Sequence, residues 1–180
     1  TGLGSAHPDS ESQDEVIAQI KRLGLHGIKI HPDIQKVKLD DYRLLKMYEL
    51  CEGRLPILIH TGDNRYDFSN PNRMLPILDS YPNLTVIGAH FGGWSIWEDA
   101  WKDYAGRENF YVDCSSTFPF IGVDAARPLV EKFTPDKILF GTDYPMWRQK
   151  DELDYILSLG LTDEELEKIF SVNILKIVES

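Results

Sequence analysis

Five short apolar segments recur along this chain at a nearly constant interval, and this repeat constrains the fold more than any other feature. The segments are rich in branched and aromatic residues, as strands buried on both faces are. They span residues 27–31, 55–60, 84–90, 110–115 and 137–143. Their starts lie 28, 29, 26 and 27 residues apart, which is the length of one strand, one helix and two short loops. The repeat therefore predicts serial β/α units with parallel strands.

The segments between the predicted strands carry helical signals. Residues 11–23 and 40–52 place apolar side chains on one stripe, and a glycine follows each of them. Thr162 and Glu165 have the spacing of a capping box, so we expect the last helix to begin there. Neither a linker nor a low-complexity stretch interrupts the pattern. Residues 1–180 are therefore interpreted as one α/β domain.

The charge and hydropathy pattern excludes several classes of partner. The net charge is −10, which disfavours nucleic acid and anionic membranes as partners. The sequence has no apolar run of about 18 residues that could cross a bilayer, and its first residues lack the pattern of a signal peptide. Cys51 and Cys114 lie in different predicted elements and are interpreted as buried thiols. We expect a cytoplasmic protein whose partner is a small-molecule substrate.

Two parallel α/β architectures compete at this point, the doubly wound sheet and the (β/α)₈ barrel. A dinucleotide-binding doubly wound sheet needs a glycine-rich G-x-G-x-x-G segment after its first strand, and the sequence has none. Residues capable of chemistry follow strand after strand instead. In barrels the active site gathers at the carboxyl ends of several strands, so the barrel is favoured.

His60, His90 and Asp143 stand at the ends of three predicted strands. Side chains alternate along a strand, so residues two apart share a face. This rule places Val86 and Gly88 on the same face as His90. It also places Leu58 on the face of His60, and Leu139 and Gly141 on the face of Asp143. We therefore expect the three side chains to point into one mouth of the barrel.

Two imidazoles and a carboxylate at one mouth suit a divalent metal such as Zn²⁺, Mn²⁺ or Fe²⁺. Such a metal lowers the pKa of a bound water to about 7 and polarises a carbonyl group. A structural role for any one of these side chains is common, but three at successive strand ends favour a functional site. The residues thus predict a metal-dependent enzyme, with zinc as the first choice of metal.

Four sequence strings make a family resemblance specific: KIHP (29–32), LIHTG (58–62), GAHFGG (88–93) and FGTDYP (140–145). They resemble the strand-end motifs of the amidohydrolase superfamily. The most similar branch is the amidohydrolase-2 type, which includes aminocarboxymuconate-semialdehyde decarboxylase and its relatives. The resemblance covers nearly the whole chain and implies a metal-dependent (β/α)₈ barrel.

The resemblance also implies roles for individual residues. His60 would be a metal ligand, and Asp143 would be both a ligand and a proton acceptor. His90 would be the nearby acid/base or electrophile, and a ligand of a second metal in two-metal members. On this assignment, His90→Ala is expected to keep most of the metal and lose the chemical step.

The chain departs from the family pattern in one respect. The first strand of the family carries an H-x-H pair that completes the metal site, and this sequence contains no H-x-H. The string GSAHP (4–8) resembles the end of the third strand. The chain is therefore expected to correspond to strands three to eight, the C-terminal part of the barrel, lacking the first one or two β/α units. A gap should then separate its first and last strands.

Three further residues are weaker candidates for substrate binding. Lys29 lies where some superfamily members have a carboxylated bridging lysine, although an unmodified lysine in the barrel is typical of the matched branch. His31 either lines the pocket or hydrogen-bonds a loop. Arg65 could hold a substrate carboxylate in a bidentate manner, or it could be a solvated loop charge.

Trp94, Trp97 and Trp101 have the spacing of one helical stripe. Core packing or a subunit interface explains such a stripe better than substrate stacking does, and a homodimer therefore remains open.

Three functions compete on these grounds. The first is a metal-dependent hydrolase of a small-molecule amide, ester or lactone. The second is a metal-dependent non-oxidative decarboxylase of a small carboxylic acid. The third is an inactive barrel fragment with a binding or assembly role, which the presence of His60, His90 and Asp143 disfavours.

Overall fold

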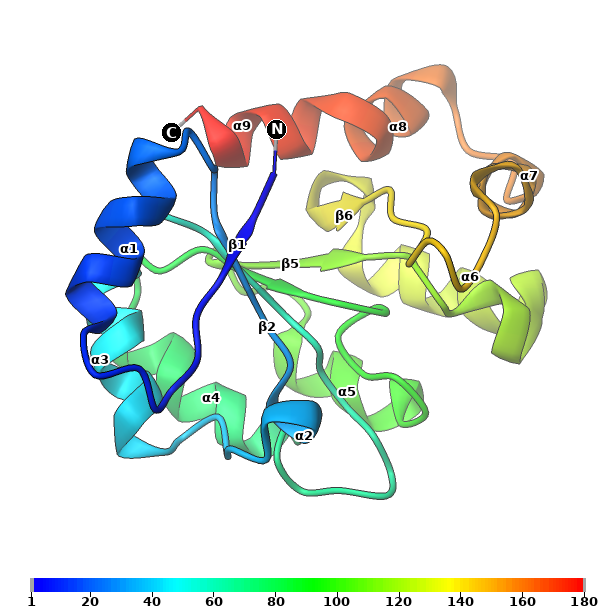
Figure 1. The fold of residues 1–180 in the computed structure, drawn as a ribbon. Coiled ribbons are helices and arrows are strands. Elements are labelled where there is room, and N and C mark those ends of the chain that lie inside the picture. Colours follow the sequence, from blue (N-terminus) through cyan, green and yellow to red (C-terminus); the bar gives the residue numbers. More distant parts are fainter. Residues whose placement is uncertain (1, 180) are drawn as a thin grey trace.

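The computed structural model describes residues 2–179 and forms an open barrel of parallel strands surrounded by helices (Figure 1). The strands are β1 (Gly4–Ser5), β2 (Ile28–Ile30), β3 (Ile57–Ile59), β4 (Val86–Gly88), β5 (Phe110–Asp113) and β6 (Ile138–Leu139). They form one sheet in sequential order, and every neighbouring pair is parallel. The predicted serial β/α architecture is confirmed.

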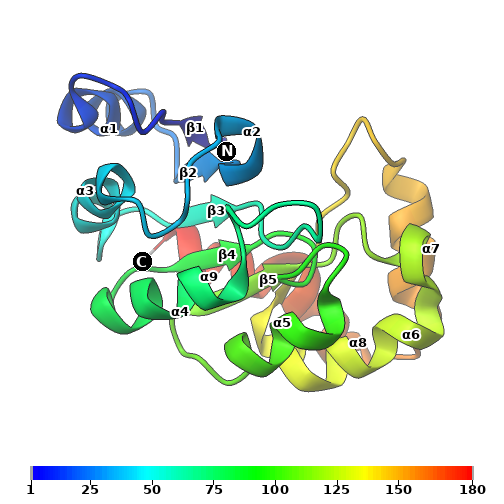
Figure 2. The same cartoon turned by 90° about the horizontal axis from the view of Figure 1, so that it is seen from below.

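Helices connect successive strands (Figure 2). They are α1 (Gln13–Arg22), α2 (Pro32–Gln35), α3 (Tyr42–Cys51), α4 (Pro71–Ser80), α5 (Trp97–Tyr104) and α6 (Phe118–Phe133). Three further helices follow β6: α7 (Gln149–Ser158), α8 (Asp163–Glu167) and α9 (Asn173–Val178). A short 3₁₀ helix, η1 (Pro135–Lys137), precedes β6, and a π-helix, η2 (Lys168–Val172), joins α8 to α9. The predicted capping box is present, because Thr162 and Glu165 exchange side chain-to-backbone hydrogen bonds at the start of α8.

The main core lies between the sheet and the outer helices. Ile57 and Ile59 of β3 are fully buried and belong to the same cluster as Leu44 of α3 and Met74 of α4. Such β-branched side chains suit a strand that is covered by helices. This face of the sheet supplies most of the apolar burial and holds the strand ends in place.

The inner face of the sheet carries a smaller apolar cluster. Its sheet members come from four neighbouring strands: Leu58, Ile87, Tyr111 and Leu139. Ile174 and Ile177 of α9 pack against them, and α9 lines one interior cavity together with Gly2 and Leu3. The C-terminal helix thus covers part of the barrel interior.

The sheet remains open between its first and last strands. Within residues 2–179, β1 pairs only with β2, and β6 pairs only with β5. This gap and the six parallel strands confirm the prediction of an incomplete (β/α)₈ barrel. Cys51 and Cys114 are buried free thiols, as expected. No helix in the described part of the chain is long and apolar enough to cross a membrane.

Candidate active site

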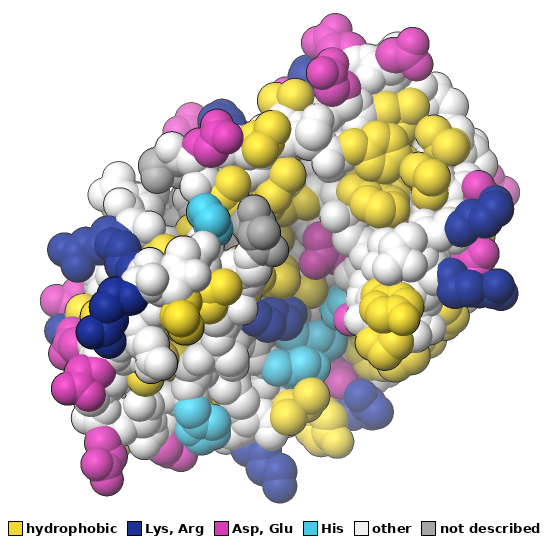
Figure 3. Space-filling model, turned by 45° about the horizontal axis from the view of Figure 1, so that its top comes forward, with side chains coloured by type: hydrophobic (Ala, Val, Ile, Leu, Met, Phe, Trp, Pro, Cys, Tyr) yellow, Lys and Arg dark blue, Asp and Glu magenta, His cyan; other side chains and the backbone are white. Residues whose placement is uncertain are grey.

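The carboxyl ends of the strands surround a cavity of about 410 Å³. Figure 3 shows histidine side chains gathered in a hollow of the surface next to a basic side chain. All six residues predicted for the site line this cavity: Lys29, His31, His60, Arg65, His90 and Asp143. A larger cavity of about 630 Å³ lies at the opposite ends of the strands and contains none of them. The sequence thus predicted which side chains meet, whereas the roles assigned to them remain predictions.

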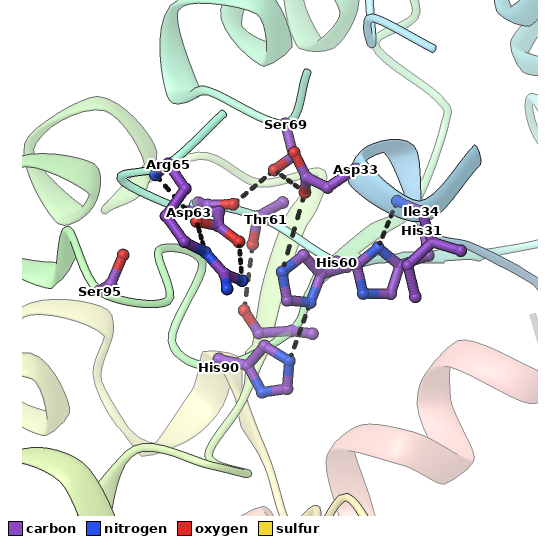
Figure 4. Close-up of polar contacts among 12 residues, drawn as sticks. His31, Asp33, Ile34, His60, Thr61, Asp63, Arg65, Ser69, His90 and Ser95 are labelled. Atoms are coloured by element: carbon purple, nitrogen blue, oxygen red, sulfur yellow. Dashed lines mark hydrogen bonds and ion pairs between the residues drawn. The ribbon is translucent and has the colours of Figure 1, made fainter. Parts of the chain in front are cut away.

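His60 is the central residue of the site (Figure 4). It follows β3 on the same face as Leu58, so its ring points into the cavity as the alternation predicts. Its Nδ1 lies 3.2 Å from Nε2 of His90. Its ring stacks on that of His31, with centroids 3.9 Å apart and planes inclined by 10°. Three imidazoles from three successive strand ends are therefore in contact.

His90 reaches the cavity by a different route from the one that the sequence predicts. The inward residue of β4 is Ile87, while Val86 belongs to the outer core. The prediction that Val86 and Gly88 share the inner face with His90 is therefore wrong. His90 turns inward because its backbone leaves the strand in the left-handed region, at φ 60°.

Left-handed backbone recurs at this end of the sheet. Ser116 and Asp143 have φ 50° and φ 53°, close to the value at His90. Such a conformation costs of the order of 1 kcal/mol for a residue other than glycine. It tends to cluster at active sites, where the surrounding structure holds it. The strand ends thus adopt an unfavourable backbone conformation that directs their side chains toward the cavity.

Hydrogen bonds fix the β5–β6 side of the cavity. Nδ1 of His90 lies 3.0 Å from the carbonyl oxygen of Ser115. The Asp143 carboxylate accepts a hydrogen bond of 2.7 Å from the Ser116 hydroxyl, which in turn accepts one of 2.9 Å from the Trp147 indole. Asp143 itself is exposed to solvent. This carboxylate is held in place but remains accessible to a substrate.

Asp33 is a member of the site that sequence reasoning missed. It lies in the first turn of α2, and its side chain is only 3% exposed. Oδ2 accepts a hydrogen bond of 2.6 Å from the Ser69 hydroxyl, whereas Oδ1 is buried and has no partner in the described part of the chain. The string HPD could have indicated it, since the aspartate follows His31 by two residues.

His31, Asp33 and His60 form a potential metal-ligand group. One ligand atom from each lies within 4.8 Å of the others. Burial, followed by the neighbouring charges, lowers the pKa of His60 to about 2 and that of His31 to about 4. Burial also raises the pKa of Asp33. A neutral imidazole has one nitrogen with a lone pair, so two imidazoles and a carboxylate are a donor set that fits a divalent metal. In His31, Nδ1 accepts a long hydrogen bond of 3.4 Å from the Ile34 amide, which the metal would replace.

The two predicted cations of the site differ in availability. Arg65 donates from Nε and Nη2 to the Asp63 carboxylate at 2.9 and 2.7 Å, so its bidentate face is occupied. Within residues 2–179, the Lys29 ammonium has no hydrogen bond or ion pair. Burial lowers the pKa of Lys29, although Asp113 and Asp143 act in the opposite direction. Lys29 is therefore the better candidate for a substrate carboxylate.

Aromatic side chains form one wall of the cavity. Trp94 contacts the ring of Phe120 edge to face, at 5.5 Å between centroids, and the Arg65 guanidinium lies 5.3 Å from the Trp94 ring. The predicted helical stripe of three tryptophans is wrong at its start, because α5 begins at Trp97. Trp94 belongs to the preceding loop and lines the cavity instead.

A family model described as "Amidohydrolase" matches residues 3–179, which is nearly the whole chain. The chain belongs to the amidohydrolase family. The resemblance predicted from the four strand-end strings is thereby confirmed, and the members of this superfamily are metal-dependent enzymes. A comparison with curated proteins gave no match.

Solved structures share the fold of this chain. An uncharacterised TIM-barrel protein from Bordetella bronchiseptica is 25% identical, with a TM-score of 0.81 over 98% of this chain and 66% of its own. A 2,6-dihydroxybenzoate decarboxylase from Rhizobium is 17% identical, with a TM-score of 0.74 over 98% and 70%. An amidohydrolase from Burkholderia multivorans with bound zinc is 10% identical, with a TM-score of 0.80 over 98% and 72%. This chain thus spans about two thirds of the Bordetella protein.

Proposed function

We propose that this amidohydrolase is a metal-dependent hydrolase of a small amide, ester or lactone that carries a carboxylate group. The observation that carries the proposal is the meeting of His60, His90 and Asp143 in one cavity. His60 offers a neutral imidazole to a divalent metal. Zinc is the first choice, since a zinc-containing amidohydrolase has the same fold. The bound metal would lower the pKa of a water molecule and polarise the substrate carbonyl.

Asp143 is proposed as the proton acceptor of the reaction. The sequence resemblance gives it the roles of ligand and proton acceptor, and its exposure at the cavity mouth favours the second. Ser116 holds one carboxylate oxygen at 2.7 Å, and the second oxygen has no hydrogen bond within residues 2–179. That oxygen can take a proton from the attacking water and return it to the leaving group.

Lys29 is proposed to bind the substrate carboxylate, because its ammonium group is unpaired and partly buried. It lines both the site cavity and an adjoining interior cavity of about 530 Å³. Leu58, Ile87 and Leu139 contribute to the wall of this second space. The apolar part of a small organic acid would fit there, with its carboxylate at Lys29.

Decarboxylation of a small aromatic acid is the second candidate. The aromatic wall at Trp94 and Phe120 suits a ring, and the similar Rhizobium structure is that of a 2,6-dihydroxybenzoate decarboxylase. In this reaction the bond between the carboxylate and the ring breaks, CO₂ leaves, and the ring carbon takes a proton. Asp143 in its acid form would supply that proton.

Parallel assays distinguish the two candidates. The protein is loaded with Zn²⁺ or Mn²⁺ and offered a panel of carboxylated lactones, amides and esters, and separately a panel of hydroxybenzoic acids. Acid release in the first panel supports hydrolysis, and CO₂ release in the second supports decarboxylation. Either activity should disappear in His60→Ala, and Lys29→Met should raise KM for carboxylated substrates more than for their neutral analogues. Turnover that survives both a chelator and His60→Ala would contradict the proposed function.

A further inference from the structure

The backbone carbonyl of Ser115 fixes the protonation pattern of the histidines in the site. A carbonyl oxygen only accepts hydrogen bonds, so Nδ1 of His90, 3.0 Å away, must carry the hydrogen. The Ser115 hydroxyl donates to Asp113 and can therefore also accept from the same Nδ1 at 3.0 Å. In the neutral ring of His90, Nε2 is then unprotonated.

This pattern continues to His60. The unprotonated Nε2 of His90 lies 3.2 Å from Nδ1 of His60, so it accepts the hydrogen of that atom. Neutral His60 then has its lone pair on Nε2. The chain of contacts from Ser115 through His90 thus selects one tautomer of His60, as partners behind a metal ligand commonly do.

The lone pair of His60 faces a carboxylate. Nε2 lies 3.8 Å from Oδ2 of Asp33 (Figure 4). Among the described residues, neither Nε2 of His60 nor Oδ1 of Asp33 has a hydrogen-bond partner, and both atoms are buried. The His60 residue is 9% exposed. Burying such groups face to face is unfavourable unless a positive charge lies between them.

The separation of these atoms favours a cation over a shared proton. A hydrogen bond between nitrogen and oxygen spans about 2.7–3.2 Å, which is shorter than the 3.8 Å observed. Two ligands of one zinc ion, each about 2.0–2.2 Å from it, lie roughly 3–4 Å apart. One nitrogen of His31 lies within 4.8 Å of the other two ligand atoms. Its ring stacks on that of His60, and its Nδ1 accepts a long hydrogen bond of 3.4 Å from the Ile34 amide, so His31 turns about its side-chain bonds to bind the same ion.

We infer that His31, Asp33 and His60 bind a divalent cation on the β2–β3 side of the cavity. Ser69 orients the Asp33 carboxylate, and His90 orients His60 as a positioning residue. The inference deepens the proposed function, on which it rests for the metal dependence of the site. Two of the ligands, His31 and Asp33, come from the β2–α2 segment, and Asp143 is then free to accept a proton.

Metal binding by the isolated protein tests this ligand set without an activity assay. Co²⁺ is titrated into the protein and followed by its visible absorption, and Zn²⁺ affinity is measured by calorimetry. Asp33→Asn and His31→Ala should each weaken binding about 100-fold, the upper end of the loss seen even for outer-sphere partners. Asp63→Asn is the matched control, because this buried carboxylate lines the same cavity but pairs with Arg65. It should change affinity less than about tenfold through its charge alone.

Thermal unfolding with and without Zn²⁺ separates a lost ligand from a lost fold. Asp33→Asn and His31→Ala should each melt as cooperatively as the unaltered protein and lose only the stabilisation by metal. Strong loss of binding in Asp143→Asn, with Asp33→Asn unaffected, would overturn the inference but keep the proposed function. If the unaltered protein binds neither metal, the inference and the proposed function both fail.

Discussion

The two sides of the cavity contain similar polar side chains but differ in how many of these side chains find hydrogen-bond partners in the protein. On the β5–β6 side, Asp113 accepts hydrogen bonds from the amides of His90 and Ser115 and from the Ser115 hydroxyl, and Asp143 accepts one from Ser116. On the β2–β3 side, Asp33 and His60 each have one buried polar atom that finds no partner within residues 2–179. Buried polar groups are nearly always hydrogen-bonded, so the unsatisfied side points to a ligand, whereas the satisfied side provides the scaffold.

The largest effect is expected at His60, where the two sides meet. His60→Ala removes the imidazole that faces Asp33 and also the partner of His90. We expect metal content and turnover to be lost together, with metal affinity falling by about 100-fold or more. Metal analysis of the purified variant, next to turnover under saturating metal, measures both. Retention of metal at the level of the unaltered protein would remove His60 from the ligand set.

His90→Ala sharpens the comparison, because His90 connects the two sides. As the residue that selects the tautomer of His60, it should affect metal affinity by about 10–100-fold, and excess metal should restore much of the turnover. The acid/base role implied by the family resemblance gives a different result. In that case metal affinity stays unchanged and kcat falls by about 10²–10⁴-fold. A loss of metal as complete as that in His60→Ala would instead indicate a two-metal site.

Glu152 of α7 interacts with Asp113 and Asp143 but does not line the cavity, and it is the exception to the satisfied β5–β6 side. Its effect is expected on stability. Its side chain is fully buried, and neither carboxylate oxygen has a partner among the residues that the structure describes. Burial, with a smaller contribution from Asp113 and Asp143, raises its pKa to about 7. Between about pH 4.5 and 7, the Glu152 carboxyl group is therefore protonated in the folded protein and ionised in the unfolded chain. The contribution of Glu152 to stability is present at low pH and is lost as the pH rises through 7.

Glu152→Gln should remove this pH dependence. At pH 8 the variant should be more stable than the unaltered protein by about 1–3 kcal/mol, while at pH 4 the two should differ little. Urea unfolding at both pH values measures the difference. An equal change in the free energy of unfolding at pH 4 and pH 8 would show that Glu152 does not titrate in this window.

The smallest effect is expected at Ser116, on the satisfied side. Ser116→Ala removes the hydrogen bond to Asp143 and the acceptor of Trp147. Such losses cost about 0.5–1.5 kcal/mol each, so turnover should fall by no more than about tenfold and metal affinity should not change. Calorimetry with Zn²⁺ and a steady-state assay provide the check. A loss of metal comparable to that in Asp33→Asn would contradict the division between the two sides.

The sequence predicted the architecture because each strand is a short buried apolar run at a regular interval. The predicted strand at 55–60 contains the observed β3 (Ile57–Ile59), and His60 points inward as the alternation requires. Alternation failed at His90, because the left-handed turn there depends on packing around the strand end rather than on a local pattern. Local spacing was also misleading at Trp94. Its spacing to Trp97 is that of a helix, but α5 begins only at Trp97.

Asp33 could not be assigned from the sequence for a related reason. An acidic residue in the first turn of a helix is common, since the positive end of the helix dipole stabilises its negative charge. Only the fold brings this residue of α2 within 3.8 Å of an imidazole that follows β3. Long-range contacts of this kind are invisible to a reading of local spacing, whereas a strand end with a histidine is not.

Anomalous diffraction from crystals grown with Zn²⁺ or Mn²⁺ tests the central claim most directly, because it locates the metal without reference to a substrate. We expect a peak about 2.0–2.2 Å from Nε2 of His60, on the side of Asp33 and His31. A peak between His60 and Asp143 would support the metal dependence but not the ligand set inferred for the β2–β3 side. An occupied metal site elsewhere in the protein, with no peak near His60, would contradict the account.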